Sequence, residues 1–185
     1  MQWTIPGTVL TASPEETGYL KEKFASMFLG GGVVLSQVSA VTGLEPYTIQ
    51  NWVKRGFLTK PIGKKYTLRQ LCRIININML KDALRMEEIC GLLSYVNGEL
   101  DDESDDLIDD SQLYFLFLGL AANYQLHDQD ETACIHAALG DYAEPVPGAR
   151  ERVEKVLRIM LTAWGASMLR QKALGMVSEL RQNEK

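Results

Sequence analysis

Residues 35–55 have the sequence LSQVSAVTGLEPYTIQNWVKR, and this stretch decides the predicted fold. Two short helices, Ser36–Thr42 and Pro46–Arg55, are expected to meet at Gly43, because a tight turn there needs a residue that tolerates left-handed backbone angles. Ser39, four residues before the glycine, is small enough to let the helices cross closely. Apolar contacts between them are expected from Val38, Leu44, Ile49 and Trp52. This spacing predicts a helix-turn-helix.

The residues that follow extend this unit. Gly56–Lys65 contains glycine, proline and lysine and predicts a hairpin-like connection, called the wing below. Thr67 and Gln70 have the spacing of a capping box, which should begin a helix that runs to about Asp82. A further helix is expected over Met86–Val96, ending at Asn97-Gly98.

In order and spacing, residues 33–96 resemble the N-terminal domain of MerR-type regulators, a winged helix-turn-helix. The matching motifs are Gly43-Leu44, Thr48-Ile49-Gln50-Asn51-Trp52, Gly56-Phe57-Leu58, Lys64-Lys65-Tyr66 and Met86-Glu87-Glu88-Ile89. The resemblance implies a cytoplasmic transcriptional regulator that binds DNA. Two features depart from the family: an arginine usually stands at the position of Gln50, and the wing is usually longer and contains arginine.

The same stretch also resembles a family of Gram-positive bacterial proteins that has a domain-of-unknown-function label. That family has an Asn-Asn-Tyr-Val-Lys-like second helix and a Lys-Lys-Tyr wing end, which compare with Gln50–Lys54 and Lys64–Tyr66 here. This second resemblance reaches to about residue 125 and implies no activity.

Beyond this unit the chain is predicted to be almost wholly helical. The expected helices run from Ser13 to about Leu29, over Leu113–Leu126, over Asp128–Leu139, and from Ala149 to about Leu180. The resulting fold class is all-α with a short wing, a MerR-like winged helix-turn-helix followed by a C-terminal helical bundle. We divide the chain into residues 1–32 (N-terminal helix and hinge), 33–98 (winged helix-turn-helix), 99–110 (acidic linker) and 111–185 (C-terminal helical domain).

Charge is distributed unevenly along the 185 residues, whose net charge is −5. Ser36–Arg85 contains nine basic and two acidic residues, whereas Glu99–Glu154 contains fifteen acidic and two basic residues. A basic surface can release counterions from a phosphate backbone, so the first stretch favours nucleic acid as a partner. The run ELDDESDDLIDD at 99–110 is interpreted as a solvated linker, with masking of the basic module by DNA mimicry, or a cation site, as the alternatives.

Double-stranded DNA is therefore the predicted partner, with the second helix in the major groove. Gln50 and Asn51 would pair with adenine through their side-chain amides. Phosphate contacts are expected from Tyr47, Thr48, Lys54, Arg55, the wing residues Lys60, Lys64 and Lys65, and Arg69. Because lysine does not make the bidentate contacts of arginine, weak or non-specific binding is a second expectation. A homodimer through the C-terminal helices would double the contacted site.

The sequence gives little indication of catalysis, of metal or cofactor binding, or of membrane insertion. Cys72, Cys90 and Cys134 are widely spaced and odd in number, which favours a reducing compartment and a cytoplasmic location. No nucleotide, zinc-protease or nucleophile-elbow motif is present, so we predict no enzyme, no catalytic residues, no cofactor and no metal. No run is apolar enough to span a membrane, and no signal peptide is recognisable. Two alternatives stay open: a protein-interaction adaptor, and a helical protein that binds a small-molecule effector.

Overall fold

The structure is a computed structural model that describes residues 3–127 and 130–182. It is mostly helical, as predicted. The helices are η1 (Pro14–Glu16), α1 (Thr17–Ser26), α2 (Leu35–Thr42), α3 (Pro46–Lys54), α4 (Leu68–Leu80), α5 (Met86–Asn97), α6 (Asp110–His127), α7 (Glu131–Ala138) and α8 (Ala149–Gln182). The strands are β1 (Trp3–Thr4), β2 (Thr11–Ala12), β3 (Val33–Val34) and β4 (Lys65–Tyr66). No described helix has the length and apolar character that crossing a membrane requires.

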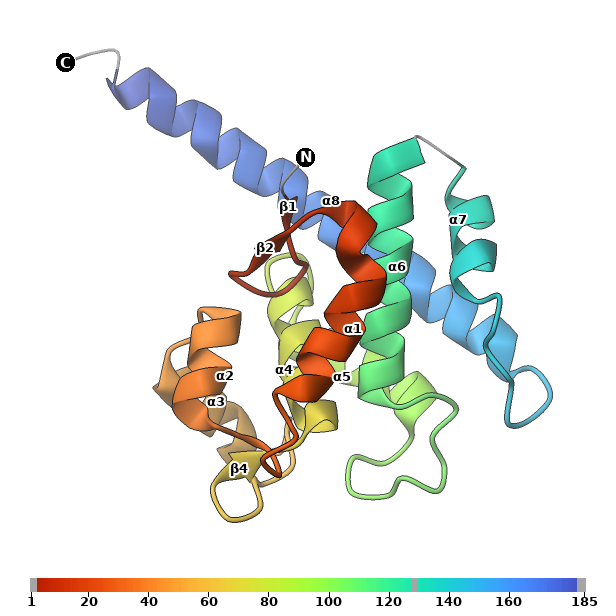
Figure 1. Cartoon of the computed structure of the whole chain (residues 1–185). Helices are drawn as coiled ribbons and strands as arrows, with labels where there is room; N and C mark the ends of the chain where they lie inside the picture. Colours follow the sequence, from red (N-terminus) through yellow and green to blue (C-terminus); the bar gives the residue numbers. More distant parts are fainter. Residues whose placement is uncertain (1–2, 128–129, 183–185) are drawn as a thin grey trace.

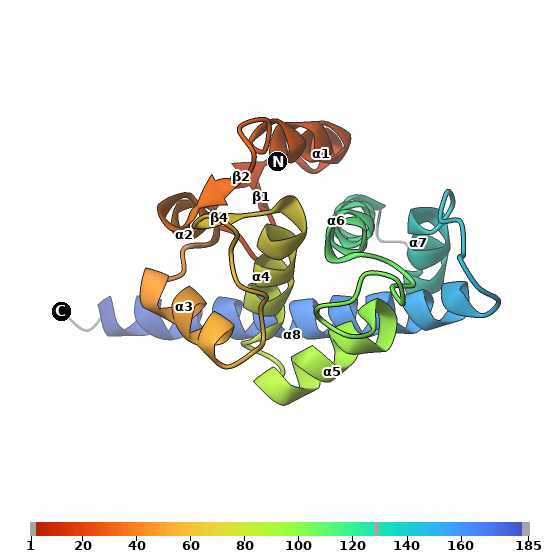
Figure 2. The ribbon, with the colours of Figure 1, turned by 90° about the horizontal axis from the view of Figure 1, so that it is seen from below.

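Helix α4 lies at the centre of the molecule. The α2–α3 pair lies on one side of it and α6 and α7 on the other, while α8 crosses beneath (Figures 1 and 2). Ten of its thirteen residues are buried, among them the polar Gln70, Arg73 and Asn76. Polar groups on a helix that is buried on so much of its circumference need protein partners, and the Asn76 amide, for example, donates to the Asp110 carbonyl over 3.3 Å.

Two short antiparallel strand pairs brace the helices. β1 pairs with β2 through Trp3 and Ala12, and β3 pairs with β4 through Val33 and Tyr66. The first pair was not foreseen in the irregular N-terminal residues. It forms because Trp3 is buried with its ring 6.2 Å from that of Trp164 in an edge-to-face contact, an interaction distant in sequence.

Helix α8 has two different halves. Up to Ser167 its inner face is buried against α4, α5, α6 and α7, as the wide apolar stripe of its sequence predicts. Residues 168–180 are exposed all round, and this end extends beyond the other helices (Figure 1). Leu169, Met176 and Leu180 are 71%, 59% and 66% exposed.

The acidic segment, residues 99–110, is exposed over residues 101–105, as predicted for a solvated linker, but its end is buried. Its last residue, Asp110, is 1% exposed, and Ile108 is buried in the same apolar core as α4 and α6. Asn97 donates a hydrogen bond from its amide to the Ile108 carbonyl, and Leu107 accepts one from Tyr142. Burial of this highly charged run depends on arginines of α4, which lie about thirty-seven residues earlier in the sequence.

Most helix boundaries agree with the sequence predictions within a few residues. Thr67 caps α4 by accepting a hydrogen bond from the Gln70 amide, and Glu16 accepts one from the Ser13 amide at the start of η1. The first turn after Ser13 is a 3₁₀ helix, and α1 ends at Ser26, earlier than expected. Asp128, the expected first residue of the next helix, lies outside the described residues.

Candidate nucleic-acid interface

Helices α2 and α3 are joined by a turn that Gly43 makes possible. Gly43 has φ 71°, and its amide donates to the Ser39 carbonyl over 2.8 Å, which ends α2. Pro46 then occupies the first turn of α3, where its fixed φ suits a helix start and no amide proton is needed. Ile49 and Trp52 are buried beneath α3, so its opposite face is fixed toward solvent.

That outer face presents most of the α3 residues predicted to contact DNA. Tyr47 is 77% exposed, Gln50 and Lys54 are also exposed, and Thr48 and Asn51 are half-buried. One helix surface thus combines amide, hydroxyl and ammonium groups. It has the donors and acceptors that reading of a base edge and contact with a phosphate require.

The wing ends in a two-residue hairpin turn. The amide of Ile62 donates to the Lys65 carbonyl (3.1 Å), and the Lys65 amide donates back to the Ile62 carbonyl (2.9 Å). The residues between them, Gly63 and Lys64, have φ 56° and 64°, the geometry of a type I′ turn. Lys64 is the sole non-glycine residue with positive φ among the described residues. A lysine in this conformation is uncommon, so its position on the wing tip invites a functional explanation.

Gln70 fixes the other end of the wing. Its side-chain oxygen accepts the Thr67 amide (2.9 Å) and completes the cap of α4. Its side-chain nitrogen donates to the hydroxyl of Thr59 (2.7 Å) and to the carbonyl of Lys60 (3.1 Å). The sequence predicted the capping role of Gln70 but not its contacts with the wing. Those contacts form only because the wing folds back against the start of α4, ten residues later in the chain.

Three of the predicted basic contacts have partners within the protein. Arg55 lies 3.9 Å from Glu87 and stacks over the Phe57 ring, while Lys65 donates to the Gly30 carbonyl over 2.7 Å. Arg69 lies 2.9 Å from Asp106 and 3.0 Å from Glu103.

Arg69 therefore faces the acidic segment and is not grouped with the outer face of α3. By contrast, no described residue forms a salt bridge with Lys54, Lys60 or Lys64. These three lysines are the ones whose charge is available to an external partner.

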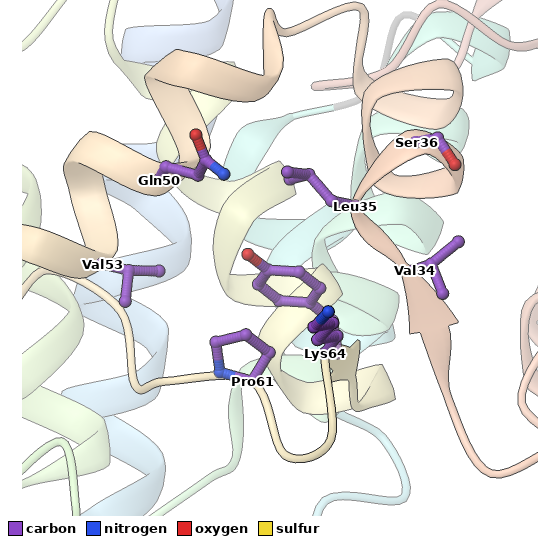
Figure 3. A pocket seen from close by; sticks show the side chains of 8 residues that line it. Val34, Leu35, Ser36, Gln50, Val53, Pro61 and Lys64 are labelled. Atoms are coloured by element: carbon purple, nitrogen blue, oxygen red, sulfur yellow. The ribbon is translucent and has the colours of Figure 1, made fainter.

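Gln50 and Lys64 meet at an apolar groove. They line it together with Val34, Leu35, Ser36, Val53, Pro61 and Tyr66, and its volume is about 530 Å³. In Figure 3 Gln50 and Val53 of α3 stand on one side, Val34 and Leu35 on the other, and Pro61 and Lys64 of the wing lie below. The sequence placed these residues in three separate elements, and only the fold brings them to one groove, called the wing groove below.

Polar residues inside α4 hold these parts in position, and sequence reasoning missed them. The Arg73 guanidinium donates to the Phe57 carbonyl over 3.1 Å, next to the start of the wing. Asn78 donates through its amide to the carbonyls of Gly7 and Thr42, both at 2.9 Å. The sequence did contain a signal for these contacts. Arg73, Asn76 and Asn78 occur among isoleucines and leucines in α4, and polar residues in so apolar a helix are expected to have protein partners.

The cysteines do not form a chemical centre. Cys72 is buried, and burial together with Asp110 raises the pKa of its thiol well above the ordinary value. A thiol held in its neutral form is a poor nucleophile and a poor metal ligand. Across the residues that the structure describes, no group of three or more His, Cys, Asp or Glu residues is arranged to hold a metal ion.

Comparison with known proteins found a family that matches part of the chain. Residues 32–117 match the family described as "Domain of unknown function (DUF1836)". The matched region runs from the residue before β3 into α6, so it includes the wing, α4, α5 and the acidic segment. The predicted resemblance to a domain-of-unknown-function family is confirmed over this range.

One curated relative is similar over part of the chain. The chain is 34% identical over 80 residues to the uncharacterized protein YkrK of Bacillus subtilis, which is 41% of this chain and 34% of that protein. The chain thus spans about a third of the length of this relative. No solved structure matches the chain.

Proposed function

We propose that residues 33–98 form a MerR-like winged helix-turn-helix that binds double-stranded DNA, and that the protein is a transcriptional regulator. The observation that supports this most is the outer face of α3. It is polar, it is fixed outward by the burial of Ile49 and Trp52, and it lies beside a wing whose lysines form no salt bridge with any residue that the structure describes.

Helix α3 would lie in the major groove. Gln50 and Asn51 are the residues that would read base edges, since a side-chain amide can pair with N6 and N7 of adenine. Tyr47 and Lys54, at opposite ends of the helix, would contact phosphates on either side of the groove. Arg55 would add a phosphate contact only if it left Glu87, an exposed pair that is easily separated.

The wing would position the duplex. Lys60 and Lys64 would contact the flanking backbone, while Lys65 is already held by Gly30 and Arg69 by Asp106. With so few cations the interface should bind weakly as a monomer, and its affinity should fall with salt along a shallow slope, because the slope is proportional to the number of phosphate contacts.

A homodimer would compensate for this small interface. The exposed end of α8 presents Leu169, Ala173, Met176 and Leu180 at intervals of four, three and four residues. This is the a/d spacing of a coiled coil, and each residue of the stripe is exposed in the single chain. Pairing of two such helices would give a two-fold protein able to contact two half-sites.

The decisive experiment measures binding of the full chain to random duplex DNA by fluorescence anisotropy across a salt series. We expect log affinity to fall linearly with log salt. The double variant Lys60→Ala/Lys64→Gly should bind more weakly and reduce the magnitude of the salt slope by about 2. Glycine is chosen at Lys64 because it keeps the positive φ of the turn.

A matched control replaces two exposed lysines on other surfaces, Lys23→Ala/Lys172→Ala, and should leave affinity and slope unchanged. Absence of binding at low salt, or equal losses in the two double variants, would overturn the proposal. Selection from a random duplex pool then tests specificity. Enrichment of adenine that disappears in Gln50→Ala would assign base reading to α3.

A further inference from the structure

The wing groove has a composition that phosphate contact does not explain. Its walls are the aliphatic side chains of Val34, Leu35 and Val53, closed by Pro61 and by the ring of Tyr66 (Figure 3). Val34, the second residue of β3, is 40% exposed, and it pairs with Lys65 of β4. Apolar concavities of about 300–1,000 Å³ with few polar groups are the usual form of a small-molecule site, and this one has about 530 Å³.

Few polar groups line the groove, and the one that is charged is positive. Lys64 is the one charged residue among those that line the groove, and the remaining polar groups are the Gln50 amide and the hydroxyls of Ser36 and Tyr66. No described acidic residue pairs with Lys64, and Lys60 and Lys65 lie on the same wing. An occupant should therefore combine an apolar body with an anionic group.

The wing turn fixes the backbone from which the Lys64 side chain extends. Because Lys64 occupies the second central position of a type I′ turn, its backbone is fixed by the paired hydrogen bonds between Ile62 and Lys65. Glycine or asparagine would meet the demand for positive φ with less strain. A lysine at this position extends from a fixed backbone and lines the groove.

We propose that the wing groove binds a monocarboxylate with an apolar body. The hydrocarbon would lie against Val34, Leu35 and Val53, and the carboxylate would pair with the Lys64 ammonium. The Gln50 amide would donate a second hydrogen bond to the carboxylate. Binding would remove apolar surface of α2, α3 and the wing from water, which favours the complex.

The site also implies a consequence for regulation. Gln50 and Lys64 belong to the surface that we propose to contact DNA, so one ligand molecule would occupy both residues at once. Carboxylate and duplex should then exclude each other, and the carboxylate would act as an effector that releases DNA. This second step rests on the proposed function, whereas binding of the carboxylate itself does not.

The test titrates the full chain with decanoate and follows backbone amide signals by NMR, without DNA. We expect saturable binding of one decanoate per chain, with the largest shifts in β3, the wing and the α3 amides near Val53. Decyltrimethylammonium, with the same chain and the opposite charge, should bind at least tenfold more weakly. Acetate, which lacks the apolar body, should not bind at matched concentrations.

Two variants and one control assign the site. Lys64→Gly removes the ammonium and keeps the turn, and Val53→Asp places a carboxylate in the groove; each should weaken decanoate binding at least tenfold. Lys23→Ala, which changes an exposed lysine of α1 outside the groove, should bind decanoate as the original chain does. Circular dichroism and thermal unfolding test whether Val53→Asp folds. If this variant does not fold, the Lys64→Gly variant alone tests whether decanoate binds in the groove.

Equal binding of the two amphiphiles, unchanged binding by Lys64→Gly, or shifts confined to other surfaces would overturn the proposal. A final measurement adds decanoate to the complex with duplex DNA. If DNA binds and decanoate displaces it, the effector role is supported. If decanoate binds but the chain has no affinity for DNA, the ligand site stands and the proposed function fails.

Discussion

Arg73 of α4 and Asp110 at the start of α6 form a buried ion pair, with 3.3 Å between the guanidinium Nη1 and the carboxylate Oδ2. The two side chains are 6% and 1% exposed. The same guanidinium donates to the Phe57 carbonyl, so one residue joins the start of the wing to the end of the acidic segment. The α2–α3 unit and the C-terminal helices are thereby linked through α4.

Removing one partner of this pair should be costly. Asp110→Ala leaves the Arg73 charge buried without a counterion, and we expect a loss of roughly 3–5 kcal/mol in the free energy of unfolding. Urea denaturation measures it. Arg73→Ala/Asp110→Ala should lose less than the sum of the two single losses, because no buried charge is left unpaired.

Glu151→Ala is the matched control for that measurement. It breaks the exposed pair with Lys155 on α8, and stability should not change measurably. Additive effects of Arg73→Ala and Asp110→Ala would contradict a direct coupling between the two residues.

Asp106 predicts a pH dependence of stability. Burial raises its pKa from 3.8 to about 6, and the attraction of Arg69, 2.9 Å away, opposes the shift without cancelling it. The folded state thus binds more protons than the unfolded state between these values, so stability falls as pH rises. The contribution is fully present below pH 3.8 and is lost as pH rises through about 6.

Urea unfolding of the original chain and of Asp106→Asn from about pH 4 to 7 isolates this contribution. The variant has no titratable group at the position, so its stability should fall less over that range. Asp110, whose pKa burial also raises, is present in both proteins, and its repulsion with Asp106 is part of the contribution that the comparison measures. Parallel pH profiles would show that Asp106 keeps an ordinary pKa.

Gln70→Glu tests how the wing is held. The variant keeps an oxygen for the Thr67 amide but replaces the nitrogen that donates to Thr59 and Lys60 with a second acceptor. We expect a loss of about 1–3 kcal/mol and faster hydrogen exchange at the Ile62 and Lys65 amides. Exchange at the α6 amides measured in the same sample provides the internal reference, and an equal increase there would indicate global destabilisation only.

Gly43→Ala should weaken the whole chain. The new methyl group would stand 2.5 Å from Cγ1 of Val9, at a φ of 71° that alanine disfavours. We expect a loss of at least about 1–2 kcal/mol from the backbone alone, measured by thermal or urea unfolding. Gly91→Ala is the control: it lies within α5 with open space around it, and should stabilise the protein by up to about 1 kcal/mol.

Association through α8 predicts a response to charge on one stripe. Leu169→Glu/Leu180→Glu would bring carboxylates together in the paired helices, so sedimentation velocity should detect monomer where the original chain is dimeric. Gln171→Glu/Ser178→Glu adds the same charge to the same exposed helix off the stripe and should remain dimeric. An original chain that sediments as a monomer at high concentration would refute the dimer.

Local sequence determined the helices and their ends. Gly43, Pro46 and the Thr67–Gln70 capping box act on backbone atoms a few residues away, so their consequences follow from spacing alone. The all-helical character and the two helices joined at Gly43 were predictable for the same reason. Counting charged residues along the chain also separated a basic stretch from an acidic one.

The tertiary structure decided which of those charges remain available. Arg69 and Arg73 count as basic residues in the sequence, yet acidic partners about thirty-seven positions later surround them. The same long-range packing buries part of an acidic run that a local pattern assigns to solvent, and it joins Val34, Val53 and Lys64 into the wing groove. Sequence spacing fixes contacts within a helix or a turn, whereas pairing of desolvated charges and the shape of a groove depend on how distant elements pack.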